Sequence, residues 1–491
     1  MRYELTPPFT NTRGNYFTVK IPKIEFIANA PQADWPFFVR QGKNCTDPYQ
    51  GLNIRWTSTQ AVCGGGLNNN LLETKYKNFA PRIGIAYNFD DKTVIRAGFG
   101  IFYMQDIGNA MYFDLARNIA ARVTLNSNIG TPTLFWNNAI PGGNGAIAQV
   151  PPPYAFTASY DHTTSYTMQY LLNVQRQFGN NWVIEAGYLG SVSRHLYGFQ
   201  NINQAVPGTS GSIASRVPFP NFGVIQLVAD GFNANYNSGS VKVTRRFSEG
   251  MNLITSYTWS KSMDNSSGIR NQGFDTLFPQ DNRCLRCEYA LSAFDTRHRF
   301  VLGGVYELPV GKGKLLDIQN SFANAFAGGW QLSANMTIQS GVPQTLSIGG
   351  VDNAGTGNQG SDRPNYTGVG NGYAANRTPS RWYDSASFTS APAGTFGAVG
   401  RNTLITPHFQ SIDMALAKRF AMPYSERHAL QFRLEAFNVF NHPSWGAPNG
   451  NILAGAAFPG APANAARQGF GVISSTAIPM RQLQLGLKYS F

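Results

Sequence analysis

The fold class is decided by the last eleven residues, Arg481-Gln-Leu-Gln-Leu-Gly-Leu-Lys-Tyr-Ser-Phe491. Apolar residues occupy every second position from Leu483 onward, and polar or small residues fill the positions between them. Successive side chains of a β-strand point to opposite faces, so one face of this segment is apolar and the other is polar. About eleven residues is also the length of a tilted strand that crosses a bilayer. The segment therefore predicts a membrane-spanning strand.

The composition agrees with a membrane protein built from strands. Charged residues make up 13% of the chain, about half of the usual share, while aromatic residues also reach 13% and Gly numbers 51. The mean hydropathy is -0.24. The sequence contains no unbroken apolar run of the ~18 residues that a transmembrane helix needs. If the chain crosses a membrane, it does so as a β-barrel.

Ten further segments alternate in the same way and pair into five hairpins. The pairs are 81–89 with 93–103, 166–174 with 182–188, 241–247 with 251–259, 300–308 with 330–338, and 412–420 with 430–436. The final strand and a partial one near Arg2 to Pro7 bring the expected number to about 12.

Short and long connections alternate strictly along the chain. The long connections are residues 104–164, 192–236, 262–295, 341–410 and 441–480. Outer-membrane barrels have short periplasmic turns and long extracellular loops. We therefore expect residues 1–491 to form an all-β, antiparallel up-and-down transmembrane barrel portion in a Gram-negative outer membrane, with a periplasmic C-terminus. A soluble propeller or sandwich is the alternative, although loops of about 40 residues are uncommon in such compact domains.

The polar faces of the strands predict the lining of a lumen. An Arg or Lys in hydrocarbon costs about 2 to 4 kcal/mol near the midplane, so the register must send charges to the other face. The lumen-facing candidates are Lys242, Arg246, Arg297, Arg299, Gln431, Arg433 and Glu435. These side chains either contact a plug or a cargo, or form a solvated lining. Aromatic residues such as Tyr257 and Trp259 fit interfacial girdles.

Four cysteines lie in the expected loops, where oxidation is favoured. Cys45, Cys63, Cys284 and Cys287 are possible disulfide partners, and their pairing stays open. Their spacing does not fit a zinc ribbon, so no metal site is expected. The loop from Asp352 to Asp362 has oxygen ligands that suit calcium, but it fits no EF-hand and reads more simply as a polar loop.

Several functional classes find no support in the sequence. It contains no HExxH or nucleophile-elbow pattern, so we expect neither an enzyme nor a cofactor. The net charge of +13 is spread along the chain, which argues against nucleic acid and favours a basic lumen or contact with lipid headgroups. The segment after Met1 has no secretory signal, which an outer-membrane protein requires. We therefore expect the chain to be the C-terminal part of a longer precursor.

Short sequence motifs along most of the chain resemble those of the Oar-like β-barrel of TonB-dependent outer-membrane transporters of acidobacterial type. The matching stretches are Asn78–Gly84, Gly98–Tyr103, Tyr236–Ser238 with Arg245–Phe247, Ser256–Ser262, Phe294–Phe300 and Glu435–Pro443. The resemblance implies a barrel of about 22 strands, a plug and a TonB-contacting segment. Compared with that family, we expect this chain to lack the plug domain, the TonB box and the first barrel strands. Phe491 resembles the terminal aromatic residue that the barrel-assembly machinery recognises.

Two functions follow as hypotheses. The first is the barrel of a transporter that takes up bulky nutrients, a glycan or peptide cargo among them, by plug-gated and energy-coupled passage. The second is a passive outer-membrane pore or a surface-adhesion and display barrel. A plug and a TonB box upstream of Met1 would favour the first.

Overall fold

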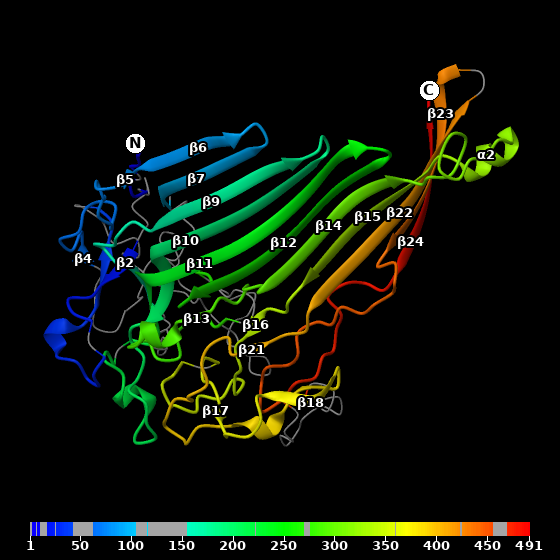
Figure 1. The fold of residues 1–491 in the computed structure, drawn as a ribbon. Helices are drawn as coiled ribbons and strands as arrows, with labels where there is room; N and C mark the ends of the chain where they lie inside the picture. The colour runs from blue at the N-terminus through cyan, green and yellow to red at the C-terminus, as the bar shows by residue number, and fades with distance from the viewer. Residues whose placement is uncertain are drawn as a thin grey trace, which may run out of the picture.

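One large sheet dominates the fold (Figure 1). The computed structural model describes residues 2–5, 7–9, 17–24, 26–42, 62–104, 115, 155–220, 222–269, 275–358, 360–422, 425–454 and 469–491. Of the 13 strands in the sheet, 11 follow one path in which each strand is antiparallel to its neighbours. In chain order these are β6 (Arg82–Asp90), β7 (Thr93–Tyr103), β9 (Tyr166–Phe178), β10 (Trp182–Asn201), β11 (Ile225–Ser248), β12 (Met251–Asp264), β14 (His298–Glu307), β15 (Trp330–Gln339), β22 (Phe409–Met422), β23 (Ser425–Phe437) and β24 (Gln482–Ser490).

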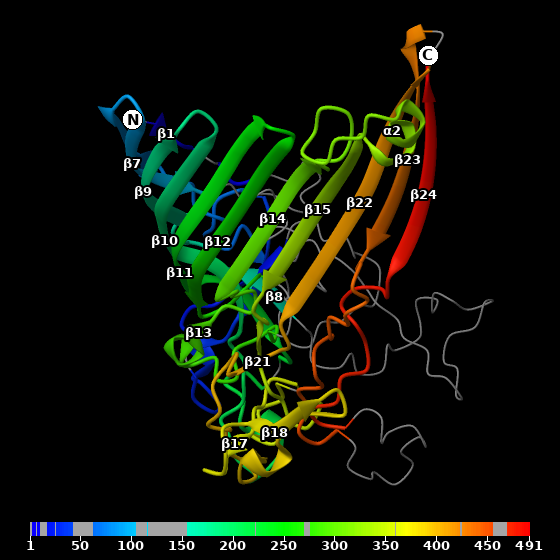
Figure 2. The same ribbon diagram turned by 45° about the vertical axis from the view of Figure 1, so that its right-hand side comes forward.

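These eleven strands are the five predicted hairpins and the predicted final strand, so the antiparallel all-β fold class is confirmed. Two short strands join the sheet off this path: β8 (Ala155–Ala158) runs parallel to β11, and β13 (Ala290–Leu291) pairs with β12. Among the described residues, no strand pairs with the outer edge of β6 or of β24. The two edge strands lie at opposite sides of the curved sheet (Figure 2).

The register gives the sheet two faces of different polarity, because residues that pair across neighbouring strands share a face. One row crosses eight strands with apolar side chains: Tyr87, Ile95, Val174, Ala186, Val241, Tyr257, Phe300 and Ile338. The adjacent row on the other face is polar or small: Arg96, Asn173, Gly187, Ser240, Thr258, Arg299 and Gln339. We call these the apolar face and the polar face of the sheet.

The long connections gather at one end of the sheet and fold into a body that we call the cap (Figures 1 and 2). It comprises the described residues of 17–42, 62–80, 155–165, 195–235, 262–297, 340–408 and 438–481. Its largest hydrophobic cluster includes Phe38, Ile202, Phe219, Ile225 and Phe232. The cap therefore contains a buried hydrophobic core, whereas the middle of the sheet does not contain one.

Small elements complete the fold. The short strands are β1 (Arg2–Tyr3), β2 (Phe17–Lys20), β3 (Phe37–Arg40), β4 (Val62–Cys63), β5 (Phe79–Ala80), β16 (Pro343–Gln344), β17 (Asn365–Tyr366), β18 (Tyr373–Thr378), β19 (Arg381–Tyr383), β20 (Phe388–Thr389) and β21 (Leu404–Ile405). The helix α2 (Ser321–Ala327) lies in the connection between β14 and β15, and four 3-10 turns occupy Gln32–Asp34, Ile213–Ser215, Leu285–Glu288 and Ser385–Ser387. No helix in the described ranges has the length and apolarity of a membrane span.

Some expected boundaries were wrong. In the part of the chain that the structure describes, the segment near Arg2 to Pro7 adds no strand to the large sheet, because β1 pairs with β5 alone and prolines that lack an N–H donor follow it. The expected loop 192–236 is much shorter, because β10 continues to Asn201 and β11 begins at Ile225. These extensions of β10 and β11 pack into the cap, which covers both of their faces. The alternation of apolar and polar residues therefore disappears in them.

The other long connections are not plain loops either. The connection 104–164 contributes β8, although most of it lies outside the described residues. The connection 262–295 holds β13 and the turn Leu285–Glu288, and 341–410 holds three small sheets that the sequence analysis did not predict. The connection 441–480 is described except for residues 455–468.

Candidate functional site

The candidates on the polar face fall into two separate groups. Lys242 on β11 lies beside Glu185 on β10, with its Nζ 3.4 Å from Glu185 Oε1. Arg433 and Glu435 lie together on β23, with Nε 2.9 Å from Oε1. Four strands of the sheet path separate the two groups. The structure therefore does not bring the sequence candidates into one cluster.

The register places three further candidates on the polar face or at its limit. Arg299 pairs with Thr258 and Gln339 in the polar row, and Gln431 lies between Arg419 and Lys488. The pairing of β11 with β12 shifts between Arg245 and Ser248, so the register does not assign the Arg246 side chain to a face. The Arg246 backbone N–H donates to Asn181 O at 2.8 Å.

Arg297 is a further lumen-facing candidate from the sequence. It precedes the first residue of β14, His298, and belongs to the cap. Its Nη2 lies 3.6 Å from Asp295 Oδ2, and Asp295 is buried. Because Asp295 also accepts from the Ser262 backbone N–H at 2.6 Å, the pair fixes the path of the chain where β12 meets the cap.

Three cations lie on the apolar face near the short turns, which sequence reasoning missed. The register places Arg176 beside Ile184, Arg245 beside Trp182, and Lys418 beside Trp330. Arg245 lies 5.3 Å from the centre of the Trp182 ring, and Lys418 Nζ lies 5.6 Å from that of Trp330. Each of these cations lies close to an aromatic residue, either nearby in sequence or on the neighbouring strand. These aromatic neighbours were the sequence signal from which the positions of the cations could have been predicted.

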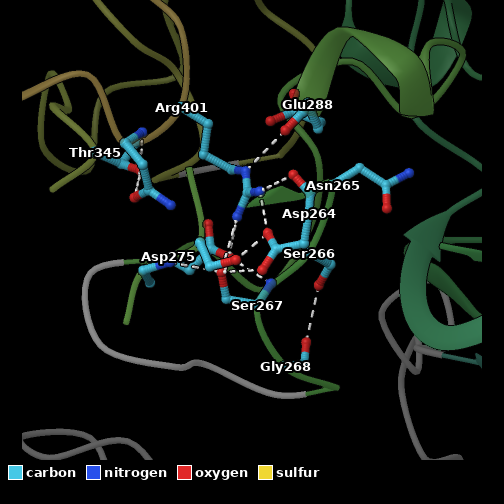
Figure 3. Close-up of polar contacts among 12 residues, drawn as sticks. Asp264, Asn265, Ser266, Ser267, Gly268, Asp275, Glu288, Thr345 and Arg401 are labelled. Carbon is cyan, nitrogen blue, oxygen red and sulfur yellow. Dashed lines mark hydrogen bonds and ion pairs between the residues drawn. The ribbon is translucent and has the colours of Figure 1, made fainter. Parts of the chain in front are cut away.

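The most highly organised polar site lies in the cap, around Arg401 (Figure 3). The Arg401 side chain is 3% exposed. Its Nη1 donates to Asp275 Oδ2 at 2.6 Å, its Nε donates to the Glu288 carbonyl at 2.9 Å, and its Nη2 forms an ion pair with Asp264. Ser267 Oγ donates to the Asp264 carboxylate at 3.0 and 3.1 Å. We call this group the Arg401 centre.

A further buried ion pair lies beside the Arg401 centre. Arg363 donates to both carboxylate oxygens of Glu288, at 2.8 and 2.9 Å. Glu288 Oε1 also accepts from the Gln280 backbone N–H at 3.1 Å. Both arginines belong to the connection 341–410, and all three acids lie in or beside the connection 262–295. The three ion pairs, Arg363–Glu288, Arg401–Asp264 and Arg401–Asp275, therefore join two connections that are far apart in sequence.

Burial dominates the electrostatics of the Arg401 centre. Burial raises the pKa of Asp275, and the Arg401 guanidinium only partly offsets this effect. Removing one member of a buried pair leaves an uncompensated charge, which costs about 3 to 5 kcal/mol. The centre can therefore hold the cap in one conformation. Each of its acids is engaged by an arginine.

The structure also assigns one cysteine pair. A disulfide joins Cys284 to Cys287, within the turn that carries Glu288. Cys45 and the side chain of Cys63 lie outside the described residues. In the described part of the chain, no three His, Cys, Asp or Glu side chains group as metal ligands. Asp352, considered for calcium, accepts from the backbone N–H groups of Thr356 and Gly357, both at 2.8 Å.

Comparison with known proteins identifies one family. A family model described as an outer membrane beta barrel domain matches residues 1–484. No curated protein matches the sequence. Among solved structures, the outer membrane transporter YddB from Escherichia coli is 11% identical with a TM-score of 0.42, over 77% of this chain and 38% of that one.

Two further solved structures are similar at the same level. FpvA of P. aeruginosa, bound to heterologous pyoverdines, is 8% identical with a TM-score of 0.41, over 85% of this chain and 34% of that one. The ferric-catecholate import receptor Fiu of E. coli is 10% identical with a TM-score of 0.39, over 89% of this chain and 39% of that one. The chain thus spans less than two fifths of the length of these structures.

Proposed function

We propose, from the premise that this chain belongs to the family of outer membrane beta-barrel domains, that it is the C-terminal barrel portion of a TonB-dependent transporter. In this proposal the transporter takes up bulky nutrients by plug-gated, energy-coupled passage. The observation that carries the proposal is the apolar row that crosses eight strands of the sheet, with a row of polar or small residues beside it on the opposite face. A wall with one face in lipid and the other toward a wide polar lumen needs this separation.

The strand directions support a barrel larger than this chain. Neighbouring strands alternate in direction along the eleven-strand path, so β6 and β24 run the same way. Pairing them directly would create a parallel joint. An antiparallel barrel therefore needs an odd number of additional strands between them, and the Oar-like barrel of about 22 strands satisfies that condition. Such strands, like the plug and the TonB contact, would come in addition to the eleven strands of this path.

The orientation follows from the cap. We place the cap outside the cell and the short turns and Phe491 in the periplasm, because outer-membrane barrels carry their long connections externally. The Cys284–Cys287 disulfide is consistent with an oxidising environment. Phe491 is 90% exposed, so the barrel-assembly machinery can reach it. In this orientation cargo meets the cap first, and the polar face with Lys242 and Arg433 lines its later path.

The proposal is tested with the complete gene product in a Gram-negative host. Photocrosslinking groups placed in its N-terminal region should capture TonB, and the protein should appear in the outer-membrane fraction. A protein that reaches the outer membrane but never captures TonB, and that conducts ions in planar bilayers by itself, would support a passive pore instead. Loss of Phe491 without any loss of outer-membrane insertion would remove the assembly role of that residue.

A surface-adhesion or display barrel is the second candidate, favoured by the size and internal order of the cap. In its described residues the cap has three hydrophobic clusters and three buried ion pairs, more structure than a simple entrance needs. Glycan or cell binding by the intact protein, unchanged when TonB is deleted, would support this candidate.

A further inference from the structure

A cavity of about 200 Å³ opens on the apolar face of the sheet, at the end that joins the cap. It is lined by Gln410, Ile412, Asn438, Phe440 and His442. Ile412 pairs with Met336 and Gln410 pairs with Ile338, and Ile338 belongs to the apolar row. The cavity is therefore part of the surface that we assign to the membrane, on the side of the sheet opposite the polar face.

The backbone forms this cavity because β23 leaves β22 early. Their last pair is Met414 with Ala436, whereas β22 extends down to Phe409. Asn438 then adopts a φ of 50°, and its backbone N–H donates to Asp413 Oδ1 at 2.8 Å. The Val439 N–H donates to Ile412 O at 2.9 Å. The departing chain is thus fixed beside β22.

The side chain of Asn438 holds the next turn in place. Its Oδ1 accepts from the His442 N–H at 3.0 Å, and its Nδ2 donates to Pro479 O at 3.2 Å. Asn438 is only 8% exposed. The wall of the cavity is therefore an ordered part of the fold, because both Oδ1 and Nδ2 of Asn438 form hydrogen bonds within the protein.

The cavity combines an apolar wall with a basic rim. Phe440 is 68% exposed and Met480, close in the chain to β24, is 80% exposed. Arg481 lies at the rim, where its Nη1 is 3.4 Å from Val439 O. The rings of His408 and His442 are 6.5 Å apart, and both residues are exposed. Among the contacts described for this cavity, Asp413 carries the only carboxylate. It projects from the polar face and accepts a hydrogen bond from the Asn438 backbone N–H.

We propose that this cavity binds one acyl chain of a phosphorylated lipid from the membrane leaflet on the cap side. The acyl chain lies against Ile412 and Phe440, and the phosphate lies near Arg481 and the two histidines. The volume far exceeds the ~30 Å³ share of one water molecule, and an apolar recess open to hydrocarbon is filled by hydrocarbon. The inference rests on the proposed outer-membrane location, since only there does lipid cover the apolar face.

The site is tested in outer membranes that contain the full chain, with a diphosphorylated glycolipid that carries a diazirine on one acyl chain. The expected result is labelling of peptides that contain Ile412 or Phe440. Ile412→Trp fills the cavity and should lower labelling about tenfold, the factor that 1.4 kcal/mol of binding corresponds to. Leu416→Trp is the matched control, because Leu416 lies on the same face of the same strand. It should leave labelling unchanged.

The basic rim is tested with a variant that leaves the cavity intact. Arg481→Gln should reduce labelling by the phosphorylated probe and leave labelling by its dephosphorylated counterpart unchanged. Equal labelling of all variants by both probes would overturn the proposal. Heat-dependent gel mobility and membrane fractionation are measured on the same samples. A chain that is absent from the outer membrane contradicts the proposed function, whereas an inserted chain without selective labelling contradicts only the lipid site.

Discussion

The sheet and the cap use apolar residues in opposite ways. On the sheet, Ile83 and Ile85 are each 64% exposed and Leu485 is 71% exposed. In the cap, Phe219 and Ile225 are fully buried. Apolar surface is removed from water wherever the chain permits it, so exposure on this scale is stable only if the sheet meets hydrocarbon. The same chain is therefore built for two solvents, and the boundary between them lies where β10 and β11 enter the cap.

The ion pairs differ in the same way. On the sheet, the side chains of Lys242 and Glu185 are 44% and 28% exposed. In the cap, Arg401 and Asp264 are 3% and 2% exposed. Exposed pairs are screened and contribute little, whereas a buried pair that loses one partner leaves a charge without compensation. Removing a charged side chain should therefore lower the stability of the cap more than that of the sheet. Adding a charged side chain should lower the stability of the sheet more than that of the cap.

Arg401→Ala should have the largest effect. It leaves Asp264 and Asp275 buried without their cation, so the cap should lose about 3 to 5 kcal/mol of stability. Hydrogen exchange should speed up in the connections 262–295 and 341–410 and not in β14 or β15. The control is Arg381→Ala, which removes an exposed pair with Asp384 in the same region and should cost at most about 1 kcal/mol. Equal effects of the two variants would contradict the role of the Arg401 centre.

A charge added to the apolar face should have the next largest effect. Leu302 pairs with Thr255 and Met336, so Leu302→Arg would place a guanidinium in hydrocarbon at a cost of about 2 to 4 kcal/mol. Val301→Arg is the matched control on the polar face, where water or counter-charges can solvate the group. Urea titration in lipid vesicles measures both. If Val301→Arg proved the more destabilising variant, the assignment of the faces would be reversed.

A pH effect should distinguish the cap from the sheet. Burial lowers the pKa of His162 below its ordinary value of 6.5, although hydrogen bonding with Tyr160 and the charge of Asp230 oppose this. The unfolded chain then binds the proton more tightly than the folded cap. The stability that His162 provides is fully present above pH 6.5 and is lost as the pH falls through the lower, folded pKa. Denaturant midpoints should fall less on acidification in His162→Gln than in the unmodified protein.

The smallest effect is expected for Arg433→Ala. The side chains of Arg433 and Glu435 are 55% and 23% exposed, so loss of their ion pair should change the stability of the sheet by at most about 1 kcal/mol. Uptake measured in cells with the complete protein separates the two interpretations of this residue. Unchanged uptake indicates a solvated lining, and reduced uptake at unchanged protein levels indicates contact with cargo or plug.

The sheet was predictable from the sequence because each of its strands meets lipid on one face and a polar space on the other. That difference forces a period of two into segments such as 300–308, which became β14. The cap was not predictable in this way. Phe199 and Val228 pair across β10 and β11 and are both buried in the cap, so the period disappears there.

The Arg401 centre was not predictable for a different reason. Arg401 and Asp264 are 137 residues apart, and neither lies in a recognisable motif. Their contact depends on how two long connections fold against each other. The register of one strand fixes that of its neighbours, so the structure places Lys242 and Arg299 on the same polar face of the sheet. Arg297 lies outside the strand, because β14 begins one residue later, at His298.

The most direct test of the two-solvent account is a spin-label scan along β14 in outer-membrane vesicles, one cysteine at a time from position 299 to 306. Labels at Phe300, Leu302 and Tyr306 should be relaxed by oxygen dissolved in lipid, and labels at Arg299, Val301 and Val305 by a water-soluble nickel reagent. The account predicts this alternation with a period of two. Access of the nickel reagent to every position, or a pattern without alternation, would contradict it.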